Sequence, residues 1–237
     1  MSLEKLERML GSNQLKFPMP DMVVAKLTML INDENSTMED IADVVQTNPV
    51  LAGRILQMAN SAALRARSRT VSVEDAIKRL GLMFVRDVSL ALTLKSLFKG
   101  DNKKLTDVWD FSLKIASRML VLSSHFNNSS NTSMLTGLMS QIGELPILAY
   151  SSEHGELEYT KSDVKRLSAR IVRDWKLPDE IHSAINGTNN YGKMLQFVEA
   201  YLKGEVGRTS LDISFQDFEQ MEVQYADVIN QFESMMD

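Results

Sequence analysis

Apolar residues along this chain recur at the three- and four-residue spacing of amphipathic helices, and no run alternates with the period of two that a half-buried strand requires. The stretch from Leu82 to Phe98 constrains the fold most, because it is apolar almost all round and is therefore typical of a central, buried helix. Its polar stripe consists of Arg86, Ser89, Thr93 and Ser96. We therefore expect an all-α protein, a multi-helix bundle with no sheet.

Helix start and stop signals divide the first half of the chain. The prolines within residues 17–20 cannot lie inside a helix, because each proline moves the preceding residue out of the α region. Capping boxes are predicted to begin helices at Ser36 and Ser72. Asn48 is expected to cap a helix that begins at the following proline, and Gly81 is a typical residue just beyond a helix end.

The second half begins after a polar break at residues 100–104. Helices are predicted there at about residues 105–126, 132–150, 162–175, 178–186 and 190–203, with a final amphipathic helix at about 214–236. The expected domains are an N-terminal bundle over residues 1–100, a second bundle over 101–204, and a C-terminal linker and amphipathic helix over 205–237. That last helix carries several aromatic residues, so it is either a clasp over the domain or a dimer surface.

Composition narrows the function classes. The chain has 26 Lys and Arg against 31 Asp and Glu, a net charge of -5, which makes a nucleic-acid partner unexpected because phosphate neutralisation requires a basic face. The absence of cysteine excludes disulfides, thiolate metal sites and cysteine nucleophiles. No segment approaches the about 18 uncharged apolar residues of a membrane span, and the first ten residues do not resemble a signal peptide. We therefore expect a cytoplasmic protein that does not bind a membrane.

Three segments in the first half carry a family resemblance. Residues 17–20 read Phe-Pro-Met-Pro before a helix, and residues 73–81 contain Ala-Ile-Lys-Arg-Leu-Gly. Residues 48–62 are similar to the pattern Asp-Pro-x-Leu-x-x-x-Leu-Leu-x-x-Ala-Asn-Ser-Ala, with Asn48 in place of the aspartate. In this order and spacing the segments resemble the HDOD family, a divergent branch of the HD phosphohydrolase superfamily, over about residues 17–98.

The resemblance also indicates where a metal centre would lie. Looser landmarks occur at Trp109–Ser112, Gly137–Gly143 and Trp175–Pro178. Catalytic HD proteins hold metal through a histidine, an adjacent His-Asp dyad and a later aspartate. In this chain the resemblance places Phe111 at the position of the first histidine and Ser140 and Gln141 at the positions of the dyad. It places Asn186 where a further histidine pair often lies, and Glu199 at the position of the last aspartate. Ser, Gln and Phe do not replace such ligands, so the resemblance implies the family fold without a metal centre or other cofactor.

Other candidate sites are weaker. The polar residues selected as candidate binding residues are Asn48, Arg54, Gln57, Asn60, Ser61 and Arg86. Their alternative roles are a solvated helix face and hydrogen bonding to the local backbone. Arg65, Arg67 and Arg69 form the only dense basic cluster, which is expected to be an exposed loop. The three histidines lie far apart in the sequence, and no phosphate-binding glycine loop or Gly-x-Ser-x-Gly element occurs.

These patterns lead to a hypothesis that rests on the resemblance. The chain is expected to be a non-catalytic bacterial signal-transduction or regulatory protein that acts through protein partners, with a nucleotide as a candidate small ligand. One alternative is a metal-dependent phosphohydrolase with an unorthodox site. Another is a nucleotide or second-messenger receptor with a polar pocket near Gln141 and Arg86.

Overall fold

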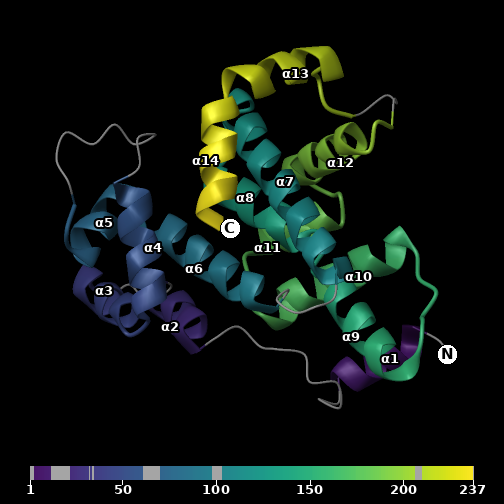
Figure 1. Cartoon of the computed structure of the whole chain (residues 1–237), viewed down its shortest axis with the longest axis horizontal. Coiled ribbons are helices and arrows are strands. Elements are labelled where there is room, and N and C mark those ends of the chain that lie inside the picture. Colours follow the sequence, from purple (N-terminus) through teal and green to yellow (C-terminus); the bar gives the residue numbers. More distant parts are fainter. Residues whose placement is uncertain are drawn as a thin grey trace. The chain divides into compact units, whose positions relative to one another are not determined.

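The computed structural model describes residues 3–11, 22–31, 33, 35–60, 70–97, 103–205 and 210–236. Over these residues the regular structure is helical throughout, without a strand, which confirms the predicted all-α fold (Figure 1). The helices are α1 (Leu3–Gly11), α2 (Met22–Ile31), α3 (Met38–Gln46), α4 (Pro49–Ala59), α5 (Val73–Leu80), α6 (Leu82–Leu97), α7 (Lys103–His125), α8 (Ser130–Met139), α9 (Glu144–His154), α10 (Lys161–Asp174), α11 (Asp179–Ile185), α12 (Asn190–Leu202), α13 (Phe215–Gln224) and α14 (Ala226–Met236). None of the described helices is both long enough and apolar enough to cross a membrane.

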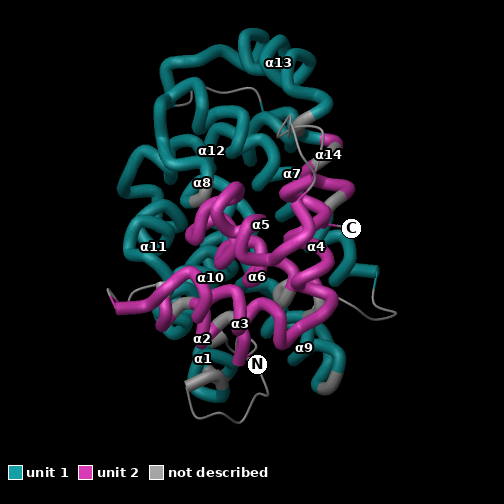
Figure 2. The backbone as a smooth tube through the Cα atoms, turned by 90° about the vertical axis from the view of Figure 1, so that its left-hand side faces the viewer, with its two compact units in different colours: residues 1–19, 98–229 teal, residues 20–97, 230–237 magenta. Residues whose placement is uncertain are grey.

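The chain forms two compact units (Figure 2). Unit 1 comprises residues 1–19 and 98–229, and unit 2 comprises residues 20–97 and 230–237. The division after residue 97 lies beside the polar break from which the sequence predicts a boundary. The sequence did not predict that the first nineteen residues belong to the same unit as the second half of the chain, or that the last eight belong to the same unit as residues 20–97.

The capping box that begins α3 lies one residue later than predicted. Thr37, not Ser36, is the N-cap, and its hydroxyl accepts the backbone N–H of Asp40 at 3.2 Å. The carboxylate of Asp40 accepts the backbone N–H of Thr37 at 2.8 Å, which closes the reciprocal pair. The sequence offered two adjacent hydroxyl residues, and the aspartate three positions after Thr37 completes the box as well as the predicted glutamate would.

The other two start signals in unit 2 are confirmed. The side-chain oxygen of Asn48 accepts the backbone N–H groups of Val50 and Leu51, each at 3.1 Å, at the start of α4. Ser72 accepts the backbone N–H of Asp75 at 3.0 Å at the start of α5. These caps satisfy amides that a helix start otherwise leaves unpaired. The prolines at residues 17–20 lie outside the described residues.

The core of unit 2 is formed by the apolar faces of α2 to α6. Its fully buried side chains include Leu27, Ile41, Ile55, Ile77 and Val85. Helix α6 is the nearly all-apolar stretch that the sequence marks as central. Burying one such aliphatic side chain contributes about 1.5–3 kcal/mol, so this cluster accounts for the packing of the unit.

In unit 1 the helix predicted at 132–150 is two helices, α8 and α9, separated at residues 140–143. The cause is close packing against α10, because a Cβ at Gly143 would lie 2.3 Å from the carbonyl oxygen of Val164. The hydroxyl of Ser168 accepts the Gly143 N–H at 2.9 Å and donates to the carbonyl of Ser140 at 3.0 Å. A single buried side chain thus holds both ends of the break.

The predicted final helix is also divided, at Tyr225, into α13 and α14. Helix α13 is fixed to unit 1 by Phe218, which is fully buried and meets the ring of Phe197 edge-on at 5.3 Å. Glu222 of the same helix pairs with Arg118 of α7 at 2.6 Å. These contacts support the interpretation of α13 as a clasp on unit 1.

Candidate functional site

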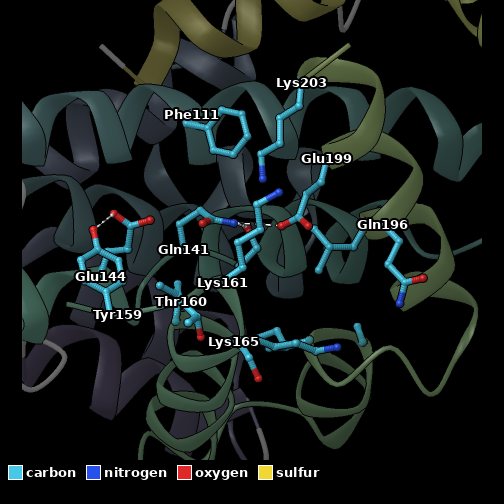
Figure 3. Close-up of a pocket in the computed structure, with 16 residues that line it drawn as sticks. Phe111, Gln141, Glu144, Tyr159, Thr160, Lys161, Lys165, Gln196, Glu199 and Lys203 are labelled. Atoms are coloured by element: carbon cyan, nitrogen blue, oxygen red, sulfur yellow. Dashed lines mark hydrogen bonds between the residues drawn. The ribbon is translucent and has the colours of Figure 1, made fainter. Parts of the chain in front are cut away.

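A cavity of about 580 Å³ opens in unit 1 beside the break between α8 and α9. Phe111, Ser140, Gln141 and Glu199, four positions that the family resemblance assigns to a metal centre, all line it (Figure 3). They come from α7, the break itself and α12. The structure therefore brings together residues that are up to 88 positions apart in the sequence.

The fifth position, Asn186, does not line this cavity. Its amide donates to the carbonyl of His182 at 3.1 Å, at the end of α11. Both residues line a more open depression of about 640 Å³, where Arg173 lies 2.7 Å from the His182 ring nitrogen. Lys165 lines both hollows, so they are adjacent within unit 1.

The side chain of Gln141 is held in place by hydrogen bonds. Its amide nitrogen donates to Glu199 at 2.9 Å and lies 3.3 Å from the Ser140 hydroxyl. Ser140 in turn donates to the carbonyl of Gly137 at 2.8 Å. The amide of Gln141 and the carboxylate of Glu199, at two of the positions that the resemblance assigns to a metal centre, therefore bond directly to one another.

Three lysine side chains bring positive charge to the cavity. Lys161 and Lys165 lie one turn apart on α10, and Lys203 follows α12 directly. The Lys203 ammonium lies 5.2 Å from the centre of the half-buried Phe111 ring, a cation–π distance. Lys161 pairs with Glu205 at 3.0 Å, whereas Lys165 and Lys203 form no ion pair with any described residue.

Two carboxylic acids share the cavity with these lysines. Burial raises the pKa of Glu199, and the charge of Lys203 and the hydrogen bond from Gln141 offset part of that rise. Burial likewise raises the pKa of Glu144, whose carboxylate lies 3.4 Å from the Tyr159 hydroxyl. The site thus combines partly desolvated carboxylates with ammonium groups.

The cavity is also lined by residues that the sequence did not indicate, namely the three lysines, Glu144, Tyr159 and Gln196. A partial signal exists, because Gln196, Glu199 and Lys203 follow one another at the spacing of one helix face. Lys161 and Lys165 show the same spacing. Nothing local in the sequence indicates that these two faces meet.

The residues of the cavity do not fit a resident metal ion. Within the described ranges, no group of three or more His, Cys, Asp or Glu side chains is placed to hold one. Phe111 offers no donor atom, and an amide and a hydroxyl replace the imidazole and carboxylate that hold a hydrolytic metal. What the cavity offers instead is hydrogen-bonding groups and positive charge.

The candidate residues of unit 2 are not among the residues that line this cavity, all of which belong to unit 1. Asn48 caps α4, and Arg54 reaches Gln57 at 3.4 Å on the same helix. Ser61 and the basic cluster at residues 65–69 lie outside the described residues.

The side chain of Asn60 forms hydrogen bonds with nearby backbone groups. Its amide nitrogen donates to the carbonyl of Thr70 at 2.7 Å and to that of Leu56 at 2.9 Å, and its oxygen accepts the Thr70 N–H at 2.7 Å. The side chain thereby joins the end of α4 to the segment before α5. This arrangement supports a structural role for the asparagine of the motif.

Arg86 is buried in unit 2, where its guanidinium lies 2.6 Å from the carboxylate of Asp87. Burial raises the pKa of Asp87 to about 6, although the charge of Arg86 opposes the rise. Because Arg86 belongs to unit 2, it is not among the residues that line the cavity with Gln141.

Several solved structures have a fold similar to that of this chain. A Shewanella amazonensis SB2B protein provisionally named a metal-dependent phosphohydrolase has a TM-score of 0.74 and 18% identity, covering 99% of this chain and 98% of its own. A Marinobacter aquaeolei VT8 protein provisionally named a signal transduction protein has a TM-score of 0.68 and 21% identity, covering 94% and 60%. An HDOD domain protein of unknown function from Geobacter sulfurreducens has a TM-score of 0.63 and 18% identity, covering 98% and 96%.

At these identities the likeness is one of fold, that of an HDOD-type helical protein. The family model for the HDOD domain matches residues 17–191, and the chain belongs to the HDOD family. This confirms the resemblance on which the sequence analysis relied. No curated protein matches the chain.

Proposed function

We propose that this chain is a non-catalytic bacterial regulatory protein that acts through protein partners. The observation that carries the proposal is the direct hydrogen bond between Gln141 and Glu199, at 2.9 Å, beside Phe111. Two of the positions that the resemblance assigns to a metal are occupied by side chains that bond to one another. Hydrolysis in an HD site requires a metal that holds and activates water, and these side chains do not supply its ligands.

The apolar surface of unit 2 supports a protein as the partner. Most large apolar side chains that are exposed in the described residues belong to this unit, and Met22 and Met29 of α2 are 85% and 73% exposed. They are seven positions apart and therefore lie on one face of the helix. Exposed methionines are typical of surfaces that bind protein, whereas a polyanionic nucleic acid requires basic ones.

Metal content and turnover test the proposal. The full chain, purified without chelator, is expected to contain far less than one divalent metal per chain and to hydrolyse neither phosphomonoesters nor phosphodiesters in added Mg²⁺ or Mn²⁺. The matched control is the triple variant Phe111→His, Ser140→His and Gln141→Asp, which restores the family's donor set. It is expected to take up metal.

A wild-type chain with one or two tightly held metals and measurable turnover would overturn the proposal and restore the phosphohydrolase alternative. In that case the ligands would have to lie outside the four positions described above.

A further inference from the structure

Three lysines line the cavity against two carboxylic acids, Glu144 and Glu199, so ammonium groups outnumber carboxylates there. The ammonium groups of Lys161 and Lys203 point toward one another above Gln141 and Glu199 (Figure 3). Two ammonium groups this close repel each other, and an anion bound between them would offset the repulsion. Lys203 forms no ion pair with a described residue, although its charge acts on Glu199 and Glu144. The partner of Lys161, Glu205, is exposed and does not line the cavity.

A third ammonium group lies on another side of the same hollow. Lys165 is half-buried, has no ion pair with a described residue, and lies near the amide of Gln196 where both approach Gly187. A Cβ at Gly187 would lie 2.5 Å from the Gln196 amide nitrogen and 3.5 Å from the Lys165 ammonium. The glycine, with φ at +77°, therefore leaves room for both side chains at the cavity wall.

From this arrangement we infer that the cavity binds a small phosphorylated molecule, whose phosphate lies between Lys161 and Lys203. The inference rests on the proposed function, because a non-catalytic cavity would retain such a ligand, whereas a hydrolase would consume it. Lys165 adds positive charge on the side of Gln196, where a second phosphate or the polar body of the ligand would lie.

A phosphate fits this charge arrangement better than a carboxylate does. It carries about -1.5 to -2 charges at neutral pH and three acceptor oxygens, so it can accept hydrogen bonds from two ammonium groups at once. A carboxylate carries one charge, and Glu199 already supplies one such group beside the lysines. Lysine is a common phosphate ligand for the same reason.

The other residues that line the cavity offer hydrogen-bonding groups and apolar surface to the rest of a small molecule. Gln141 uses its amide nitrogen and Glu199 one carboxylate oxygen in their mutual bond. The amide oxygen of Gln141 and the other carboxylate oxygen of Glu199 have no hydrogen-bond partner among the described residues. Phe111, Ile185 and Leu195 supply apolar surface. At about 580 Å³ the cavity lies within the range of about 300–1,000 Å³ in which small-molecule sites occur. A nucleotide and a sugar phosphate share the required chemistry.

Isothermal titration calorimetry at low salt tests the inference with defined probes. The full chain is titrated with pyrophosphate, guanosine diphosphate, glucose 6-phosphate and, as the uncharged control, guanosine. The variants are Lys203→Gln and Lys165→Gln. The matched control is Lys104→Gln, because Lys104 is an exposed lysine of the same unit that pairs with Glu156 at 3.3 Å and does not line the cavity.

At least one phosphorylated probe is expected to bind, and guanosine is expected not to bind. The loss of a charged hydrogen bond in Lys203→Gln is expected to weaken binding about tenfold or more, with a smaller loss in Lys165→Gln and none in Lys104→Gln. Equal affinity for pyrophosphate and guanosine diphosphate would assign recognition to the anion alone. Tighter binding of the nucleotide or of the sugar phosphate would identify the source of the phosphate.

The inference is overturned if none of the phosphorylated probes binds at millimolar concentration, or if Lys104→Gln weakens binding as much as Lys203→Gln. Turnover of a bound probe would instead overturn the proposed non-catalytic function and leave the binding site in place. The two failures are therefore distinguishable. Unchanged thermal unfolding of the three variants excludes misfolding as the cause of a lost signal.

Discussion

The two compact units of this protein differ in what their polar side chains do. In unit 2, where the resemblance to the family is strongest, the motif residues bond to their own backbone, with Asn48 capping α4 and Asn60 joining α4 to Thr70. In unit 1, where the resemblance is looser, Gln141, Glu199 and three lysines meet in one cavity. The segment with the clearest motifs therefore forms a packing joint, and the segment in which the resemblance is looser forms the candidate site.

A sequence motif can arise from helix packing or from a functional site, and the two units differ in which of these they show. A motif that holds helices together constrains several consecutive residues, so it remains recognisable in a single sequence. A cavity can exchange its functional groups while the helices that carry them remain in place, so the fold alone does not determine the function. Substitutions, most of them in matched pairs, test this difference between the two units.

The largest effect is expected at the break between α8 and α9. The substitution Gly143→Ala places a methyl group 2.3 Å from the Val164 carbonyl, so α9 and α10 must separate, and stability is expected to fall by about 3 kcal/mol or more. The matched change in unit 2 is Gly53→Ala on α4, where no atom lies within 4 Å, and it is expected to stabilise by about 0.5–1 kcal/mol. Urea unfolding measures both, and a mild effect at Gly143 would remove the packing explanation for the break.

A somewhat smaller loss is expected for Asn60→Ala. It removes three hydrogen bonds and leaves the N–H of Thr70 without its acceptor, which is expected to cost about 1–3 kcal/mol. The control Gln57→Ala alters an exposed side chain of the same helix and is expected to change stability by less than about 0.5 kcal/mol. If thermal unfolding shows Asn60→Ala to be as mild as its control, the structural interpretation of the motif is wrong.

The buried pair in unit 2 predicts a dependence of stability on pH. The pKa of Asp87 is raised from 3.8 to about 6 in the folded chain, so the folded state binds more protons than the unfolded state between those values. This group therefore makes stability fall as pH rises through about 4 to 6. Stability curves of the wild type and Asp87→Asn across that range are expected to differ in slope, and parallel curves would contradict the prediction.

The smallest effects are expected at two matching helix caps. Thr37 with Asp40 in unit 2 and Thr160 with Asp163 in unit 1 form the same capping box, so each threonine-to-alanine substitution is expected to cost about 1 kcal/mol. Only Thr160 also lines the cavity. Calorimetry with pyrophosphate is therefore expected to show weakened binding for Thr160→Ala and unchanged binding for Thr37→Ala.

The sequence predicted what depends on local spacing. It indicated the all-helical fold and the start of α4 at Asn48. The family resemblance, not local spacing, pointed to Phe111, Ser140, Gln141 and Glu199, which line one cavity. It did not predict the break at Gly143, because that break results from the approach of α10, which lies some twenty residues further along the chain. Lys165 and Lys203 were missed for the same reason, since each belongs to an ordinary charged helix face until the two faces are placed together.

Helix α12 connects the cavity to α13. Its residues Gln196 and Glu199 line the cavity, whereas Tyr201 donates to Glu222 of α13 at 2.6 Å. A rotation of α12 that moved Glu199 would therefore also disturb the contact with α13. Thermodynamic reciprocity then applies, because if filling the cavity shifts the docking of α13, a protein that engages α13 must alter the affinity of the cavity by the same factor.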